Sequence, residues 1–294
     1  MPAALLARTG WGGLTFPNAA TTGPAAGGYT LTAQTAATIP ATSPYPSWVT
    51  GPDGNGFLHV TGCQFTGEVD CLAPNVIFTG CDFSAPFGQY GLSLRGSGGY
   101  TVQYCSAHGA NPSALGRLTA GIDTDTNGGA TTMTGLVIDH CNIYWGRIGL
   151  NTDTDTVSVT ITNNYFHDVT YYPNDHSENM INGTNSSNVV IANNTILNPL
   201  SQTATIGSHT TGFSNVSVTG NLIAGGGYAV YLGDTDSVNV VVTGNYFSTM
   251  YFPNCGLFGA AYPTSPPPYG SGGNVWSGNV WYDGPNRGSL IAHP

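Results

Sequence analysis

One short segment of the chain gathers the side chains best able to do chemistry. Within twelve residues it holds His167, Asp168, Asp175, His176 and Glu178. The chain has only fifteen acidic residues and seven histidines among 294, so even scattering would place about one of them in such a window. A carboxylate beside a histidine can serve acid–base hydrolysis, which requires two suitably spaced carboxyl groups. The candidate catalytic residues are therefore Asp175, His176 and Glu178, with Asp153 as a further carboxylate.

Two tyrosines in the same segment favour binding over catalysis. Aromatic rings next to carboxylates combine apolar contact with hydrogen bonding, as sugar recognition requires. The predicted ligand-binding residues are His167, Asp168, Tyr171, Tyr172, Asp175, His176 and Glu178. The alternative is a polar loop that only satisfies its own turns through side-chain hydrogen bonds.

A second group of acidic residues suggests a cation-binding site. When Gly121-Ile122 is aligned with Gly149-Leu150, Asp125 falls over Asp153 on a neighbouring repeat. Two carboxylates about 5 Å apart would repel by roughly 3 kcal/mol at an effective dielectric constant near 20. Ca²⁺ would relieve this repulsion, and the order Asp, Asp, Asn, Gly resembles the opening of a calcium loop, although its twelfth position is Thr instead of Glu. The metal candidates are Asp123, Asp125, Asn127 and Asp153, and polar turns are the alternative.

The elements that must position these residues are strands, because one pattern of alternating apolar residues recurs along the chain. A repeat of this kind is a unit that needs its neighbours in order to bury its apolar face. The nine copies are FLHVTGCQF from Phe57, VIFTGCDF from Val76, YTVQYCSA from Tyr100, LVIDHCNI from Leu136, VSVTITNNYF from Val157, VVIANNTILNPL from Val189, VSVTGNLI from Val216, VVVTGNYF from Val240 and NVWSGNVW from Asn274.

Alignment of the copies places one column of small polar residues at the same position. The column consists of Cys63, Cys81, Cys105, Cys141, Asn164, Asn194, Asn221, Asn245 and Asn279. Short alternating segments separated by Gly, Asn and Pro indicate strands and turns. We predict an all-β fold, a single-stranded right-handed parallel β-helix of about nine coils, in which equivalent residues stack about 4.8 Å apart. The stacked asparagines should form a hydrogen-bonded ladder, and the cysteines should be buried free thiols.

The predicted organisation is one elongated domain with short ends. Residues 1–56 carry no clear repeat and are expected to form an N-terminal arm and cap, residues 57–284 the β-helix, and residues 285–294 a C-terminal tail. The composition suits a turn-rich all-β chain, with 42 Gly, 19 Pro and 7% charged residues.

The charge balance restricts the partners. With five Arg, no Lys and a formal net charge of −10, binding to nucleic acid or to anionic membranes is not expected, since both require clustered cations. No apolar run approaches the roughly 18 residues of a membrane span. Met1–Gly13 lacks a basic segment, so no signal peptide is expected. Neutral sugars and cations are the remaining ligand classes.

Three tracts resemble a known family. They are HSENMINGTNSSNVVIANNTILNPLSQTATI, SNVSVTGNLIAGGGYAVY and NVWSGNV, and the opening FPNAATTGPAAGGYTLT resembles the lead-in before the first coil of the same proteins. The chain is thus similar to pectin-lyase-like β-helix proteins of actinobacteria and their tailed phages, often labelled minor tail proteins. Where that family commonly has His-x-Asp-Gly-Ile-Gln, this chain has Glu178 and Asn179 in place of the Asp and the Gly.

The resemblance implies a minor tail or tail-tip protein of the virion, assembled in the host cytoplasm and presenting loops to a host-surface polysaccharide. It also implies other tail proteins as partners through the N-terminal arm, and the sequence leaves a homo-oligomer open. The alternatives are a secreted carbohydrate-active enzyme, either a glycoside hydrolase or a polysaccharide lyase, and a purely architectural virion component.

Overall fold

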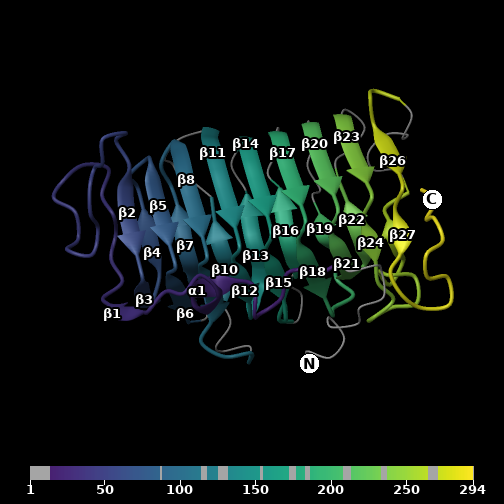
Figure 1. The fold of residues 1–294 in the computed structure, drawn as a ribbon, viewed down its shortest axis with the longest axis horizontal. Helices are drawn as coiled ribbons and strands as arrows, with labels where there is room; N and C mark the ends of the chain where they lie inside the picture. The colour runs from purple at the N-terminus through teal and green to yellow at the C-terminus, as the bar shows by residue number, and fades with distance from the viewer. Residues whose placement is uncertain are drawn as a thin grey trace.

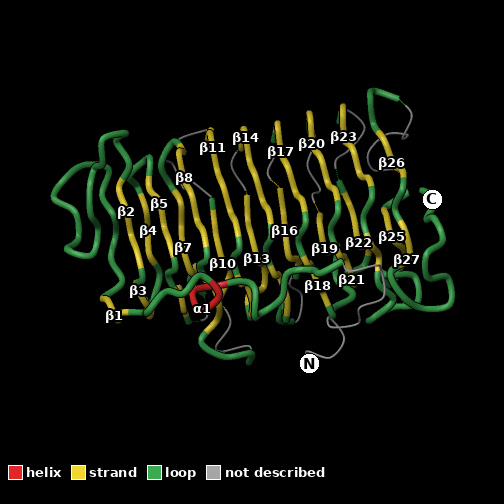
Figure 2. Tube along the Cα trace, viewed as in Figure 1, coloured by secondary structure: helices red, strands yellow, loops and turns green. Residues whose placement is uncertain are grey.

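The computed structural model describes most of the chain. The described residues are 14–86, 88–113, 118–124, 132–152, 155–171, 177–182, 186–207, 213–232, 237–263 and 271–293. They form three parallel sheets, here called A, B and C, that wind around one axis (Figure 1). The predicted right-handed parallel β-helix is confirmed. Among the described residues the one α-helix is the single turn α1 (Gly23–Ala26), drawn in red in Figure 2.

Sheet C contains the predicted repeats, each supplying one of its nine strands. Its strands in spatial order are β2 (Leu58–Thr61), β5 (Val76–Thr79), β8 (Gly98–Gln103), β11 (Thr132–Asp139), β14 (Asp155–Thr162), β17 (Ser187–Ala192), β20 (Ser214–Thr219), β23 (Val238–Thr243) and β26 (Val275–Ser277). Burial alternates along them, as in Val240 and Val242, which are buried, and Val241, which is partly exposed. This period of two is the signature that the sequence carried.

Sheet A follows sheet C after a short turn in every coil. Its ten strands are β1 (Thr32–Gln34), β3 (Cys63–Thr66), β6 (Asp82–Ala85), β9 (Ser106–Gly109), β12 (Asn142–Tyr144), β15 (Tyr165–His167), β18 (Thr195–Asn198), β21 (Leu222–Gly225), β24 (Tyr246–Phe247) and β27 (Val280–Trp281).

Sheet B completes the coils. Its eight strands are β4 (Val69–Cys71), β7 (Tyr90–Leu94), β10 (Leu118–Asp123), β13 (Gly146–Thr152), β16 (Glu178–Asn182), β19 (Ala204–Gly207), β22 (Tyr228–Tyr231) and β25 (Gly259–Ala261). The aligned pair Ile122 and Leu150 is in register here, as predicted.

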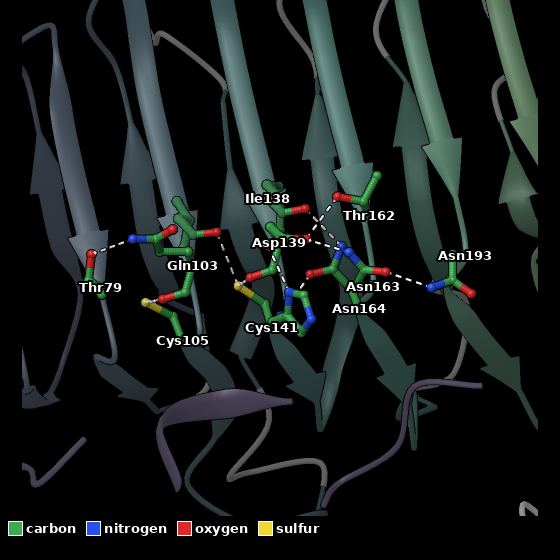
Figure 3. A network of polar contacts seen from close by, with 12 residues as sticks. Thr79, Gln103, Cys105, Ile138, Asp139, Cys141, Thr162, Asn163, Asn164 and Asn193 are labelled. Carbon is green, nitrogen blue, oxygen red and sulfur yellow. Dashed lines mark hydrogen bonds and ion pairs between the residues drawn. The ribbon is translucent and has the colours of Figure 1, made fainter. Parts of the chain in front are cut away.

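The turn between sheets C and A contains the predicted column. Asn164, Asn194, Asn221 and Asn245 are each fully buried, and each donates its side-chain amide to the next carbonyl oxygen along the column at 3.0 Å. The cysteine half is also buried, and all six cysteines are free. Figure 3 shows where the two halves meet: the Cys141 backbone N–H donates to Asn164 Oδ1 at 2.8 Å, and Cys105 occupies the same place one coil earlier.

Both ends of the chain make contacts that the repeat pattern did not predict. Strand β1 pairs with β3, and Ile39 forms a parallel bridge to Cys71, so the lead-in continues the stacking beyond the first repeat. At the other end the C-terminal tail folds back, and Leu290 forms an antiparallel bridge to Val280. The domain boundaries at residues 56 and 284 remain predictions.

Residues 16–31, here called the strap, run along the side of the solenoid (Figures 1 and 2). The Phe16 ring packs edge-on against Tyr246 and Tyr282 of the last coils. Gly23 donates its N–H to the His140 carbonyl at 2.8 Å, and Tyr29 packs on Tyr104. The strap therefore runs opposite to the direction in which the coils are added.

Candidate functional site

The predicted site residues divide between described and undescribed parts of the chain. His167, Asp168, Tyr171, Glu178 and Asp123 are described. The remaining candidates lie outside the described residues: Tyr172, Asp175, His176, Asp125, Asn127 and Asp153. The expected stacking of Asp125 over Asp153 therefore remains a prediction, although the register on which it was based is observed as far as Asp123 opposite Asn151.

His167 lies on the outer face of sheet A, in line with side chains from earlier coils. The register pairs Ser84 with His108, His108 with Tyr144, and Tyr144 with His167. These four residues stand one per coil at the same height on β6, β9, β12 and β15. We call His108, Tyr144 and His167, together with their neighbours Asp82, Trp145, Tyr165 and Asp168, the polar–aromatic row.

The rings of the row are stacked along the solenoid axis. The His108 and Tyr144 centroids are 4.7 Å apart with planes at 6°, and those of Tyr144 and His167 are 5.1 Å apart at 16°. Trp145 adds an edge-on contact to Tyr144 at 5.0 Å. The coil spacing imposes the near-parallel stacking, because equivalent outward residues of neighbouring parallel strands lie about 4.8 Å apart. The row therefore offers ring edges and polar atoms in a fixed sequence.

Carboxylates hold both histidines of the row. His108 Nε2 lies 3.1 Å from Asp82 Oδ1, and its Nδ1 lies 2.8 Å from the Gly109 carbonyl. Burial alone would lower the pKa of His108, but these hydrogen bonds outweigh it and the pKa is raised. His167 Nδ1 lies 2.8 Å from Asp168 Oδ2, and this hydrogen bond holds the pKa of Asp168 below its ordinary value.

The row is only partly accessible. The side chains of His108 and His167 are 15% and 13% exposed, whereas Asp168 is 44% exposed. Tyr171, a few residues further along, is 48% exposed. Burial raises the pKa of both Tyr144 and Tyr165 to about 12, so their hydroxyls are protonated donors at neutral pH. Exposed carboxylate and phenol groups thus flank a rigid, half-buried stack.

Glu178 was expected in an exposed loop, and that location is wrong. It is the first residue of β16, opposite Ile148 in the sheet, and is 1% exposed. This polar stretch enters a strand because pairing with β13 outweighs local polarity.

Asp123 also lies in a strand where a polar turn was expected. It ends β10, is fully buried, and accepts a hydrogen bond from Asn151 Nδ2 at 2.8 Å. Nearby, Arg95 forms ion pairs with Asp70 and Glu68. The negative charge of Asp123 also helps to raise the pKa of Arg95. Among the described residues no three His, Cys, Asp or Glu side chains are placed to hold a metal ion. Calcium binding remains a prediction.

The sequence contains a signal for the row. Every member of the stack follows the small polar column by three positions: Cys105 precedes His108, Cys141 precedes Tyr144, and Asn164 precedes His167. The cluster from His167 to Glu178 drew attention to neighbours along the chain. The repeat register identifies neighbours in space, and so adds His108, Tyr144 and Asp82.

The comparisons with known proteins concern the scaffold. A family model described as the right handed beta helix region matches residues 55–279. No curated protein matches the chain. Among the described residues, no helix has the length and apolarity needed to cross a membrane.

Proposed function

The chain belongs to the right-handed β-helix family, and from this premise we propose that it is a rigid structural protein that binds a cell-surface polysaccharide. The observation that carries the proposal is the polar–aromatic row, in which side chains 23 to 36 residues apart in sequence are brought into one line. A β-helix keeps such a line straight because each coil is fixed by its neighbours. A polymer of repeated sugar units can therefore contact several positions along this line.

The chemistry of the row favours a neutral glycan. The edges of the tyrosine and tryptophan rings give a sugar apolar contact, while histidine and carboxylate groups bind its hydroxyls. The formal net charge of −10 disfavours an anionic polymer. The ligand class that fits is thus a neutral polysaccharide lying along the solenoid axis.

We also propose a biological setting for the protein. The resemblance of the coils and lead-in to minor tail proteins of actinobacterial phages supports a place in a virion tail, with assembly in the host cytoplasm. Other tail proteins would then be partners of the N-terminal arm. A secreted β-helix protein is the alternative setting, and the row would bind a glycan equally well there.

Binding to insoluble host cell-wall polysaccharide tests the proposal. Asp168→Asn preserves shape and removes an exposed charge next to His167, and Tyr144→Ala removes the centre of the stack. We expect about a tenfold loss of affinity or more for each, corresponding to at least about 1.4 kcal/mol. Tyr262→Ala, a partly buried tyrosine that packs on Tyr231 of sheet B, is the matched control and should bind as the wild type does.

The same incubation separates the competing functions. Retention without new reducing ends or unsaturated products supports adhesion. Release of such products would replace adhesion by glycoside hydrolase or lyase activity. If the protein is not retained on the polysaccharide and releases no products, the purely architectural role is supported instead.

A further inference from the structure

The outer face of sheet C is uncharged over much of its length. Strands β17, β20, β23 and β26 carry no ionisable side chain. In a molecule with a formal net charge of −10 this is unusual, because charged residues are the normal means of keeping sheet surfaces apart. In Figure 1 no described segment crosses this part of the sheet.

A row of uncharged side chains runs along the centre of the same face. The register aligns one outward residue per strand, and most of these are β-branched: Ile77, Thr101, Val137, Thr160, Val190, Ser217, Val241 and Val275. Val190 and Val275 are 37% and 39% exposed, and Val238 at the start of β23 is 42% exposed. The other members of the row lie between buried and fully exposed, so the centre of this face presents short uncharged side chains of which three valines are the most exposed.

The polar groups beside the row are already hydrogen-bonded to one another. Asn215 donates to Asn188 at 3.1 Å, and Asn239 donates to Asn215 at 3.0 Å. Thr219 donates its hydroxyl to the Thr243 carbonyl at 2.9 Å. Burying a polar group costs free energy mainly when its hydrogen bonds are lost. These hydrogen bonds can remain when a partner covers the face, so removing water from these groups costs little free energy.

From these observations we propose that the outer face of sheet C binds a second copy of this chain. Two copies that each carry ten negative charges repel wherever charged surfaces meet, and the neutral part of sheet C lets them approach without that repulsion. Both copies also present rows with the same coil spacing, so the side chains of one row can fit between those of the other. A two-fold axis through the face would produce a closed dimer.

The size of the face agrees with a stable interface. The uncharged row spans the eight strands from β5 to β26, with Asp139 and Asp155 at strand ends on its margins; eight strands about 4.8 Å apart and some five residues long cover roughly 600 Å². Specific dimers bury about 600–1,000 Å² on each partner. The interface lies on a different sheet from the polar–aromatic row, so dimerisation and glycan binding are independent.

The mass of the full chain in solution tests the proposal. Sedimentation equilibrium between about 1 and 100 µM, concentrations that bracket a typical homodimer constant, should give twice the monomer mass of 30.4 kDa. Ser217→Glu with Val241→Glu would bury like charges against their copies, and we expect the dissociation constant to rise at least about 100-fold. Ser217→Lys should also weaken the dimer, since it buries an unpaired charge.

Thr66→Glu is the matched control, because it adds the same charge at an exposed strand position of sheet A. It should dimerise as the wild type does. Far-UV circular dichroism and the melting temperature establish that each variant is folded. A monomeric wild type at 100 µM would overturn the proposal, and so would a dimer that survives the glutamates or is lost equally in Thr66→Glu.

Discussion

At the scale of single residues, environment decides the behaviour of the acidic and histidine side chains. His108 and His167 are each paired with a carboxylate on a stacked face, whereas Glu178 and Asp123 are enclosed within sheet B. Residue type alone would rank all four as candidate ligands. Their exposure and partners assign the first pair to a surface that can bind a ligand, and the second pair to the interior of the scaffold.

The titration of His108 provides a prediction at this scale. Its pKa should lie above the ordinary value of 6.5, as measured by NMR titration of the ring protons. In Asp82→Asn the main hydrogen bond to a charge is lost while burial remains, so the pKa should fall below that of the wild type. An unchanged pKa in the variant would show that Asp82 does not hold the ring.

The same pair affects stability in a defined pH range. Because the folded-state pKa of His108 is raised, its contribution to the free energy of unfolding is complete below the unfolded-state pKa and is lost as the pH rises through the folded-state value. The wild type should therefore exceed Asp82→Asn in stability by more at pH 5 than at pH 8. Urea unfolding at the two pH values measures the difference.

At the scale of elements, small residues allow the coils of sheet B to pack closely. A Cβ atom at Gly121 would lie 2.7 Å from the Gly149 carbonyl oxygen and 2.8 Å from Ile143 Cγ2, and Gly149 is similarly enclosed by Asn179 and Phe166. The two glycines occupy equivalent positions in the alignment of the repeats. Their alignment reflects a shared steric requirement within neighbouring strands of sheet B.

Gly121→Ala should therefore destabilise the protein by about 2–3 kcal/mol, the usual cost of forcing extra volume into a packed site. Gly54→Ala is the control: no atom lies within 4 Å of the added Cβ, and we expect a change within about 0.5 kcal/mol. Chemical denaturation of the two variants makes the comparison. Equal stabilities would mean that the coils can move apart to accept a methyl group.

At the scale of the whole molecule, the strap connects coils that do not touch each other. A solenoid otherwise holds together only through contacts between neighbouring repeats. Phe16 is 7% exposed between Tyr246 and Tyr282, while Gly23 and Tyr29 contact coils nearer the N-terminal end. The strap thus links distant coils, which contacts between neighbouring repeats cannot do.

Phe16→Ala should release one end of the strap, because an aromatic side chain buried at this level contributes about 3 kcal/mol. Hydrogen exchange should then accelerate at Gly23, whose N–H is bonded to His140, while the amides of β20 stay protected. Phe258→Ala removes a phenylalanine that is 65% exposed and should leave the strap unchanged. Equal exchange at Gly23 in both variants would show that Phe16 does not anchor it.

The sequence by itself determined the repeating part of this protein. Period-two apolar residues, the turn residues and the column from Cys63 to Asn279 predicted the β-helix, the strands of sheet C and the buried ladder, because each depends on residues close along the chain or on exact repetition. The change from Cys to Asn at Cys141 and Asn164 was visible in the alignment, and the structure shows it as a change from thiols to hydrogen-bonded amides.

The tertiary structure alone decided which side chains are exposed and which distant ones meet. Burial of Glu178 and Asp123 follows from strand pairing that outweighs local polarity, and the strap depends on contacts between Phe16 and residues more than 200 positions away. The stack of His108, Tyr144 and His167 exists because successive coils place equivalent positions about 4.8 Å apart. The alignment of the repeats indicates which positions are equivalent, but only the structure shows that these side chains stack and how far they are exposed.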